Sequence, residues 1–443
     1  MPSREELKRR AFEEIDARAD EIISLAKTIL QNPEPGFRET KTSALVAKKL
    51  AEMSIPHRTG LAMTGIRAEL TGGSEGPTLA ILGELDSLIV NEHPFADPNT
   101  GAAHACGHHC QLPMVFGAMF GLMQPDVLAA LSGRLVMMAV PAEEYIEIEY
   151  RDSLHREGKI EFLGGKPEMI RLGEFDDVDL AMMIHTTSNP DEKWLCMSGT
   201  NNGTLAKKIQ FIGRGAHAGG SPHLGINALN AATMALTAIH FNRETFQDGD
   251  TVRVHPIITK GGEAVSAVPA DVRMETFVRG RTVEAIMDAN RKVDRALKAG
   301  ALAVGASVTI QTIPGYLPIM QDKNLLDLFE SNAVGLVGKE NVGYVAHRTG
   351  STDMGDVSHL MPAIHPYVGG ASGLGHGADY VVEDYDLAVI TAAKALAGTA
   401  VDLLADGASA AGSIISGHQP DMTREQYLKF MRDLASEETF RGE

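Results

Sequence analysis

Residues 104–110 hold the densest group of metal-binding side chains in the sequence. The segment reads His-Ala-Cys-Gly-His-His-Cys, and imidazole and thiolate are ligands that suit zinc, manganese, cobalt or iron. Gly107 permits a tight backbone turn that can bring its neighbours onto one ion. A closed structural zinc site would need a second ligand pair, and Cys196 has no cysteine or histidine two to four residues away. The segment therefore favours an open metal site, and packed histidines and buried thiols are the alternative.

Three apolar segments elsewhere in the chain each run into a possible ligand. Residues 78–82, 134–140 and 180–184 are apolar enough to be strands that are covered on both faces. The side chains that follow these segments are Glu84, Asp86, Glu143, Glu144 and His185. Ligands of open α/β sheets bind at the carboxyl ends of the strands. We therefore expect these residues and the 104–110 segment to meet around a divalent cation.

Length, charge and cysteine content limit the class of protein. At 443 residues the chain is longer than one hydrophobic core usually supports, so we expect two domains. A net charge of −18 argues against nucleic acid or an anionic membrane surface as a partner. The three cysteines cannot form a disulfide framework, and residues 1–10 are charged where a signal peptide would be apolar. We expect a cytoplasmic protein.

The pattern of apolar residues predicts an α/β protein with an inserted α+β unit. Helical spacing covers residues 3–32 and 41–53, ahead of the three strands. From residue 204 the predicted order is strand, helix, two strands, helix and strand, which is a ferredoxin-like arrangement of about 110 residues. Helices are predicted again at 324–337 and 386–404, and only loop and a short charged helix after residue 407.

Five motifs stand in an order that resembles one known family, the M20 metallopeptidases and amidohydrolases. They are Gly83-Glu-Leu-Asp86-Ser-Leu, His104-Ala-Cys-Gly-His108, Pro141-Ala-Glu-Glu144, Gly215-Ala-His-Ala218 followed by Pro222-His-Leu-Gly-Ile-Asn227, and His376-Gly-Ala-Asp-Tyr. The resemblance spans about residues 15 to 405 and is greatest to the bacterial and plant N-acyl-amino-acid amidohydrolases. It implies a zinc-peptidase-like catalytic domain with a central mixed sheet (1–203 and 315–443) and an inserted lid or dimerisation domain (204–314).

The resemblance also implies a metal centre. Its ligands would be Cys106, His108, Glu144, His185 and His376. They would hold one or two divalent ions per subunit, most simply manganese or zinc, with cobalt, nickel and iron as alternatives. Glu143 would be the general base that takes a proton from a metal-activated water, and Asp86 would orient a ligand imidazole.

Other residues are implied in substrate binding. His217 resembles a lid histidine that donates to the developing oxyanion and comes from the other subunit in related dimers. Arg279 and Arg348 could each grip a substrate carboxylate. Asn227 could contact substrate or cap its helix. We expect a homodimer or larger assembly and a small carboxylate-bearing substrate.

Three positions depart from the usual pattern of the family. Glu84 stands where many relatives have Asp or His, so the sequence leaves open whether a second ion binds and what holds it. His109 and Cys110 replace the more usual Asp or Asn and Gly, so the pocket beside the metal can differ in shape and charge. His104 could orient a ligand or simply pack.

The sequence thus predicts a hydrolase that cleaves a C–N bond other than a peptide bond. The favoured substrate is the amide of a small N-acyl or N-aroyl amino acid. One alternative is removal of an amino group from an aromatic ring, as in the family member that acts on 5-nitroanthranilate. The alternative of another class is a non-catalytic metal- or peptide-binding relative, against which Glu143 argues because pure binding has no use for a general base.

Overall fold

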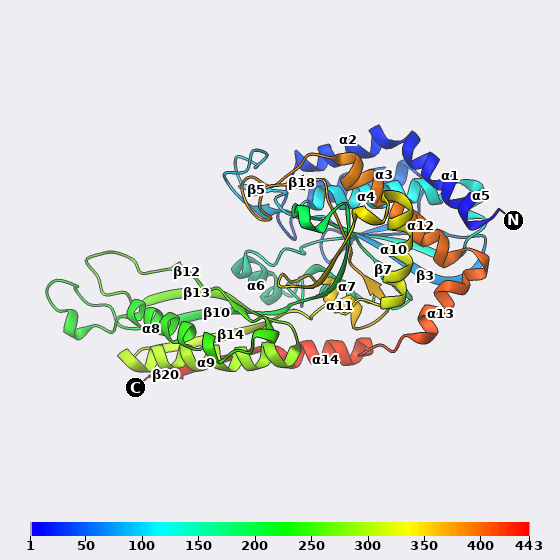
Figure 1. The fold of residues 1–443 in the computed structure, drawn as a ribbon. Helices are drawn as coiled ribbons and strands as arrows, with labels where there is room; N and C mark the ends of the chain where they lie inside the picture. Colours follow the sequence, from blue (N-terminus) through cyan, green and yellow to red (C-terminus); the bar gives the residue numbers. More distant parts are fainter. Residues whose placement is uncertain (1, 443) are drawn as a thin grey trace.

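The computed structural model describes residues 2–442 and has two lobes (Figure 1). The larger lobe contains a six-stranded mixed sheet in the order β1-β2-β6-β3-β7-β16. Its strands are β1 (His57–Leu61), β2 (Gly65–Thr71), β3 (Ser74–Glu84), β6 (Ser132–Val140), β7 (Leu180–Met182) and β16 (Ala363–Ile364). Strands β6 and β7 both pair with β3 in parallel, so their carboxyl ends lie at one edge of the sheet.

Helices cover both faces of this sheet because its central strands are apolar on both sides. The helices of the larger lobe are α1 (Arg4–Ala17), α2 (Ala19–Leu30), α3 (Thr40–Glu52), α4 (His108–Leu122), α5 (Pro125–Leu128), α6 (Ile148–Arg156), α7 (Gly165–Leu172), α10 (Lys323–Val337), α11 (Met354–Ser358), α12 (Ala392–Leu404), α13 (Ser409–Gly417) and α14 (Arg424–Leu434). The sequence predicted most of the longer ones, but not α4.

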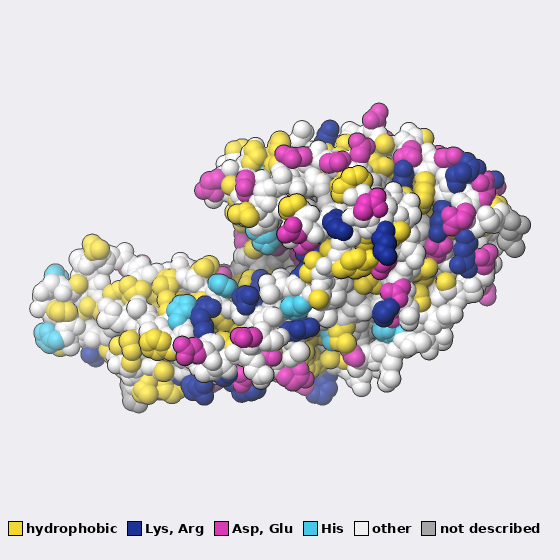
Figure 2. All heavy atoms as spheres, viewed as in Figure 1, with side chains coloured by type: hydrophobic (Ala, Val, Ile, Leu, Met, Phe, Trp, Pro, Cys, Tyr) yellow, Lys and Arg dark blue, Asp and Glu magenta, His cyan; other side chains and the backbone are white. Residues whose placement is uncertain are grey.

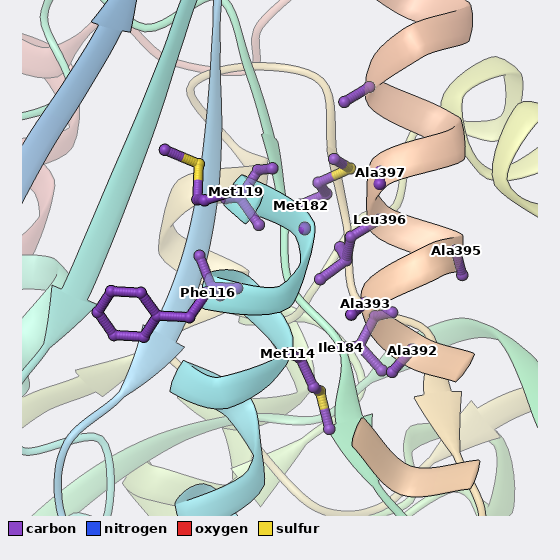
Figure 3. Packing of buried hydrophobic residues seen from close by; sticks show 14 of the residues in the cluster. Met114, Phe116, Met119, Met182, Ile184, Ala392, Ala393, Ala395, Leu396 and Ala397 are labelled. Atoms are coloured by element: carbon purple, nitrogen blue, oxygen red, sulfur yellow. The ribbon is translucent and has the colours of Figure 1, made fainter. Parts of the chain in front are cut away.

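Helix α4 is buried on every side. Figure 3 shows its residues Met114, Phe116 and Met119 in the same core as Ala393 and Leu396 of α12. The two helices approach closely at Gly117, where a Cβ would lie 2.7 Å from that of Ala393. Truncating a fully buried phenylalanine such as Phe116 to alanine would cost about 3–5 kcal/mol. A helix without a polar face has no amphipathic pattern, which explains why the sequence did not reveal it.

The smaller lobe, called the lid below, is an antiparallel sheet with two helices on one face (Figure 1). Its elements are β10 (Gly203–Ile212), α8 (Ala228–Phe241), β11 (Arg253–Val254), β12 (Ile257–Lys260), β13 (Asp271–Gly280), α9 (Val283–Val304) and β14 (Ser307–Tyr316). Side chains of β13 alternate between buried and half-buried along the strand, as expected when one face packs against helices. The sequence predicted this order with two strands between the helices, and the structure has three, because the first predicted strand is divided into β11 and β12.

The C-terminal segment differs from the prediction. Strand β20 (Ser436–Arg441) pairs with β14 and extends the lid sheet, whereas the sequence placed all of 315–443 in the catalytic domain. The strand is charged and mostly exposed, so it lacks the apolar alternation by which strands are predicted. Its backbone hydrogen bonds cover the edge of β14.

The remaining strands form three smaller sheets. A four-stranded sheet holds β8 (His185–Thr186), β9 (Leu195–Asn201), β15 (Val342–Arg348) and β17 (Tyr367–Val368), and two hairpins hold β4 (Leu88–Ile89), β5 (Ala102–Ala103), β18 (Ala371–Ser372) and β19 (Val381–Val382). The segment Asp386–Leu404 is long and apolar enough to span a membrane, but most of it is buried in the core of the larger lobe.

Candidate metal centre

The parallel strands bring the predicted ligands to one edge of the central sheet. Glu84 at the end of β3 pairs in register with Val140 at the end of β6, so the chain leaves both strands at the same level. β7 runs into His185 beside them. Helix α4 begins at this edge after Gly107, whose φ of 84° favours glycine and where a Cβ would overlap the Thr186 hydroxyl. The turn therefore presents Cys106 and His108 to the residues at the strand ends.

The five predicted ligands, Cys106, His108, Glu144, His185 and His376, are together in the structure, and we call them the ligand group. Cys106 Sγ lies 3.3 Å from His185 Nε2, and His376 Nε2 lies 3.5 Å from Glu144 Oε1. Atoms that each lie about 2.1 Å from one ion, at angles of about 90° to 109°, are separated by about 3.0 to 3.4 Å. The distances in the ligand group therefore fit donors that share an ion.

Hydrogen bonds orient the two ligand imidazoles of the sheet edge. His108 Nδ1 donates to the Asp86 backbone carbonyl at 3.0 Å, and His185 Nδ1 donates to the Thr186 carbonyl at 2.7 Å. Both Nε2 atoms are thus left with a lone pair that faces the group. The Asp86 carboxylate also accepts from the backbone N–H of Glu144 at 2.9 Å. Asp86 therefore fixes the His108 imidazole and the backbone of Glu144.

The site has an excess of buried negative groups that a divalent cation would offset. Its buried carboxylates are Glu84, Asp86, Glu143, Glu144 and Asp353, and Lys166 is the ammonium buried among them. His108 Nε2 and Glu144 Oε1 are buried and have no hydrogen-bond partner among residues 2–442. Burying such atoms unpaired is costly, and a metal ion would satisfy both. The residues present thus fit a divalent transition metal.

Glu143 lies beside the ligand group and is free to act on a water. Its Oε2 lies 3.9 Å from His108 Nε2, and its backbone carbonyl accepts from the Tyr316 hydroxyl. Burial, followed by the charges of Glu84 and Glu144, raises the pKa of Glu143 well above its usual value. A bound cation would oppose this rise, because a nearby positive charge favours the carboxylate that a general base requires.

A cleft of about 320 Å³ opens beside the ligand group and contains both predicted arginines. Figure 2 shows the concave surface between the two lobes. Arg348 is already engaged: it forms two hydrogen bonds with Glu192, at 2.8 and 2.5 Å, and stacks on Tyr367 at 3.6 Å. Arg279, at the end of β13, has no ion-pair partner within the described part of the chain, and burial lowers its pKa. Arg279 is thus the cation that remains available to a ligand.

His217 follows the end of β10 and Asn227 directly precedes α8. β10 runs from Thr204, which lines the cleft, to Ile212, a distance of about 25–30 Å at about 3.3 Å per residue. Asn227 caps α8 by accepting from the backbone N–H groups of Leu229 and Asn230. Within one chain the structure does not bring either residue to the ligand group.

A comparison with known families identifies the chain. The profile of peptidase family M20/M25/M40 matches residues 80–401. The chain therefore belongs to this family. It is 28% identical over 420 residues to a mouse Xaa-Arg dipeptidase, covering 90% of this chain and 89% of the relative. It is 25% identical over 333 residues to an N-acyl-L-amino acid amidohydrolase of Geobacillus stearothermophilus, covering 72% of this chain and 81% of the relative.

Solved structures agree with this assignment. A dinuclear metal-binding M20 peptidase from Bacillus subtilis superposes with a TM-score of 0.64 at 21% identity, covering 88% of this chain and 99% of that one. The likeness confirms the predicted fold of an M20 protein. The chain is thus an M20 family hydrolase, and its relatives include both amidohydrolases and peptidases.

Several buried polar residues of this M20 site were not predicted. Lys166 Nζ pairs with Glu84 Oε1 at 2.5 Å and with Asp353, and Gln111 exchanges two hydrogen bonds with Glu84. Glu39 accepts from the Ala142 N–H at 2.7 Å, just before the two glutamates. Lys166 is the second residue of α7, and Glu39 directly precedes α3. A charged residue at the start of a helix is usually exposed to water, so the sequence did not indicate that either is buried.

The unusual residues beside the ligand group face away from it. His104 and His109 are buried and line a separate cavity of about 220 Å³ with Tyr385. His109 Nε2 lies 3.3 Å from the Tyr385 hydroxyl. Cys110 is buried in the core around α4. None of the three belongs to the donor groups found within residues 2–442.

Proposed function

We propose that this M20 protein is a metal-dependent hydrolase that cleaves the amide bond of a small N-acyl or N-aroyl amino acid. The observation that carries the proposal is the place of Arg279. Its guanidinium lines the same cleft as Glu143 and the ligand group and has no ion-pair partner within the described residues. A planar guanidinium suits a carboxylate bidentately, so Arg279 would hold the free carboxylate of the substrate.

In this proposal the residues of the cleft have three separate roles: metal binding, proton transfer and substrate orientation. Cys106, His108, Glu144, His185 and His376 would hold one or two divalent ions. When bound, such an ion polarises the scissile carbonyl and lowers the pKa of a water to about 7. The Glu143 carboxylate takes a proton from the attacking water and passes it to the leaving nitrogen, and Arg279 fixes the orientation of the substrate.

A second copy of the chain would complete the site by supplying His217. Its Nδ1 accepts from the N–H groups of Gly219 and Gly220 at 3.1 and 2.8 Å, so Nε2 carries the proton and can donate to an oxyanion. The lid also exposes apolar side chains, among them Phe241, Ile257 and Ile258. Figure 2 shows hydrophobic patches on that lobe. Since β20 covers one edge of the lid sheet, the edge at β12 remains for a partner.

A dipeptidase is the second candidate function. The similarity to Xaa-Arg dipeptidase extends over 90% of this chain, and a dipeptide also presents a carboxylate to Arg279. The two functions differ on the other side of the scissile bond, where a dipeptide carries an ammonium group and an acyl amino acid does not.

A substrate panel tests the proposal. The metal-loaded protein would be assayed with N-acetyl and N-benzoyl amino acids, dipeptides that end in arginine, and 5-nitroanthranilate. We expect release of free amino acid from the acylated compounds, and none from any of them with Glu143→Gln. Faster release from dipeptides would favour the second candidate. Ammonia release from nitroanthranilate alone, or no turnover of any compound, would contradict both.

A further inference from the structure

The end of β3 offers the metal centre a carboxylate that is not in the ligand group. Glu84 is fully buried, and its Oε2 lies 3.2 Å from His108 Nε2. This Nε2 has no hydrogen-bond partner among the described residues, and its lone pair faces the site because Nδ1 donates to Asp86. Glu84, His108 and Glu143 also form a donor group of their own, with all ligand atoms within 4.8 Å of one another.

Two donors, Lys166 and Gln111, hold the Glu84 carboxylate in place beside His108. Lys166 Nζ donates to Oε1 at 2.5 Å. The Gln111 side-chain amide donates to Oε2 at 2.9 Å, while its carbonyl accepts from the Glu84 backbone N–H at 2.8 Å. A carboxylate can accept about four hydrogen bonds or metal contacts, so Oε2 retains a lone pair. Lys166 and Gln111 are therefore positioning residues for an oxygen that remains able to bind an ion.

Pairing with Lys166 does not account for the charge of Glu84. The same ammonium also pairs with Asp353, and Lys166 is the one lysine or arginine that residues 2–442 place against either carboxylate. Two buried carboxylates share one cation, so one negative charge is left over. An uncompensated buried charge is costly, and the face of the pair that is not closed by Lys166 is the face toward His108.

We propose that Glu84 is a further ligand of the metal centre, binding an ion that it shares with His108. The 3.2 Å separation of the two donor atoms matches that of atoms bound to one ion, as calculated above. Glu84 would thereby add a carboxylate to the donor group that His108 forms with Glu143. The inference rests on the proposed function, because it assumes that the centre holds a divalent ion.

Zinc affinity of matched variants tests the inference. Glu84→Gln removes the negative charge of the proposed ligand. Asp353→Asn is the matched control, because it removes a negative charge from the other carboxylate that pairs with Lys166. We expect chelator competition to show that Glu84→Gln weakens zinc binding by at least 100-fold and that Asp353→Asn weakens it less than tenfold. Equal losses in the two variants, or wild-type affinity in Glu84→Gln, would overturn the assignment.

Two further measurements distinguish the loss of a metal ligand from a folding defect. Glu84→Asp keeps the charge but shortens the side chain, so it should also lose affinity even if Glu84→Gln folds poorly. The visible absorption of the cobalt-loaded protein reports the ligand set and should change in Glu84→Asp but not in Asp353→Asn. If wild-type protein binds no zinc, the proposed function fails; if it binds zinc and hydrolyses substrate but Glu84→Asp matches it in affinity and spectrum, only this inference fails.

Discussion

Replacing Arg279 by methionine should remove recognition of the substrate carboxylate while leaving the metal centre in place. Hydrogen bonds to charged groups contribute about 1.5–3 kcal/mol each, and a bidentate pair makes two of them. The Arg279 side chain lines a cleft and is only partly buried, so the lower end of that range applies. A loss of about 3 kcal/mol corresponds to a decrease in kcat/KM of about 150-fold.

The assay compares an N-benzoyl amino acid with its carboxamide, which lacks the charge. For Arg279→Met we expect the large decrease with the acid and less than a threefold change with the amide. Arg348→Met is the matched control: its guanidinium is paired with Glu192, so its loss should lower Tm and affect both substrates alike. If Arg279→Met lowers activity equally for acid and amide, Arg279 does not bind the carboxylate.

Four more outcomes are expected. Glu143→Gln should keep its metal content by mass spectrometry and lose about 10²–10⁴-fold in kcat, because only the proton transfer is removed; loss of the metal would instead make Glu143 a ligand. Mixing the His217→Ala and Glu143→Gln variants should restore activity that neither variant has alone, because one active site of a mixed dimer then contains both wild-type residues. If no activity is recovered, His217 does not act across subunits. Gly107→Ala should lower Tm and metal affinity together, since an alanine at a φ of 84° costs about 1–2 kcal/mol and its Cβ would displace the turn. Unchanged metal affinity would show that the turn does not position the ligands. Burial, and then the charge of Asp86, raises the pKa of Glu39 to about 7, so the folded metal-free protein binds this proton more tightly than the unfolded chain does. The free energy of unfolding should therefore decrease by up to about 3 kcal/mol as the pH rises from about 4.5 to 7. Glu39→Gln should reduce this pH dependence in urea titrations, and an equally steep dependence in the variant would refute the assignment.

Those parts of the site that follow from strand geometry could be predicted from the sequence. Apolar runs at 78–82, 134–140 and 180–184 mark buried strands, and parallel pairing places their ends at one edge. Side chains such as Asp86 and His185 therefore had to meet once the strands were recognised. Helix α4 was missed because burial on all sides removes the polar face that makes a helix visible in a sequence.

Burial of a charged residue cannot be inferred from its neighbours in sequence, and this is why Lys166 was missed. It follows Gly164 and Gly165 in what reads as a surface turn, and nothing local indicates two carboxylates from distant segments, Glu84 and Asp353. The structure connects this lysine with Glu84, one of the three positions that depart from the family pattern. A longer acidic side chain at position 84 can reach a buried ammonium and His108 at once, so the substitution and the lysine are physically coupled. A Glu84→Asp variant would then shorten the reach to both, and a double-mutant cycle with Lys166→Met should show non-additive changes in zinc affinity.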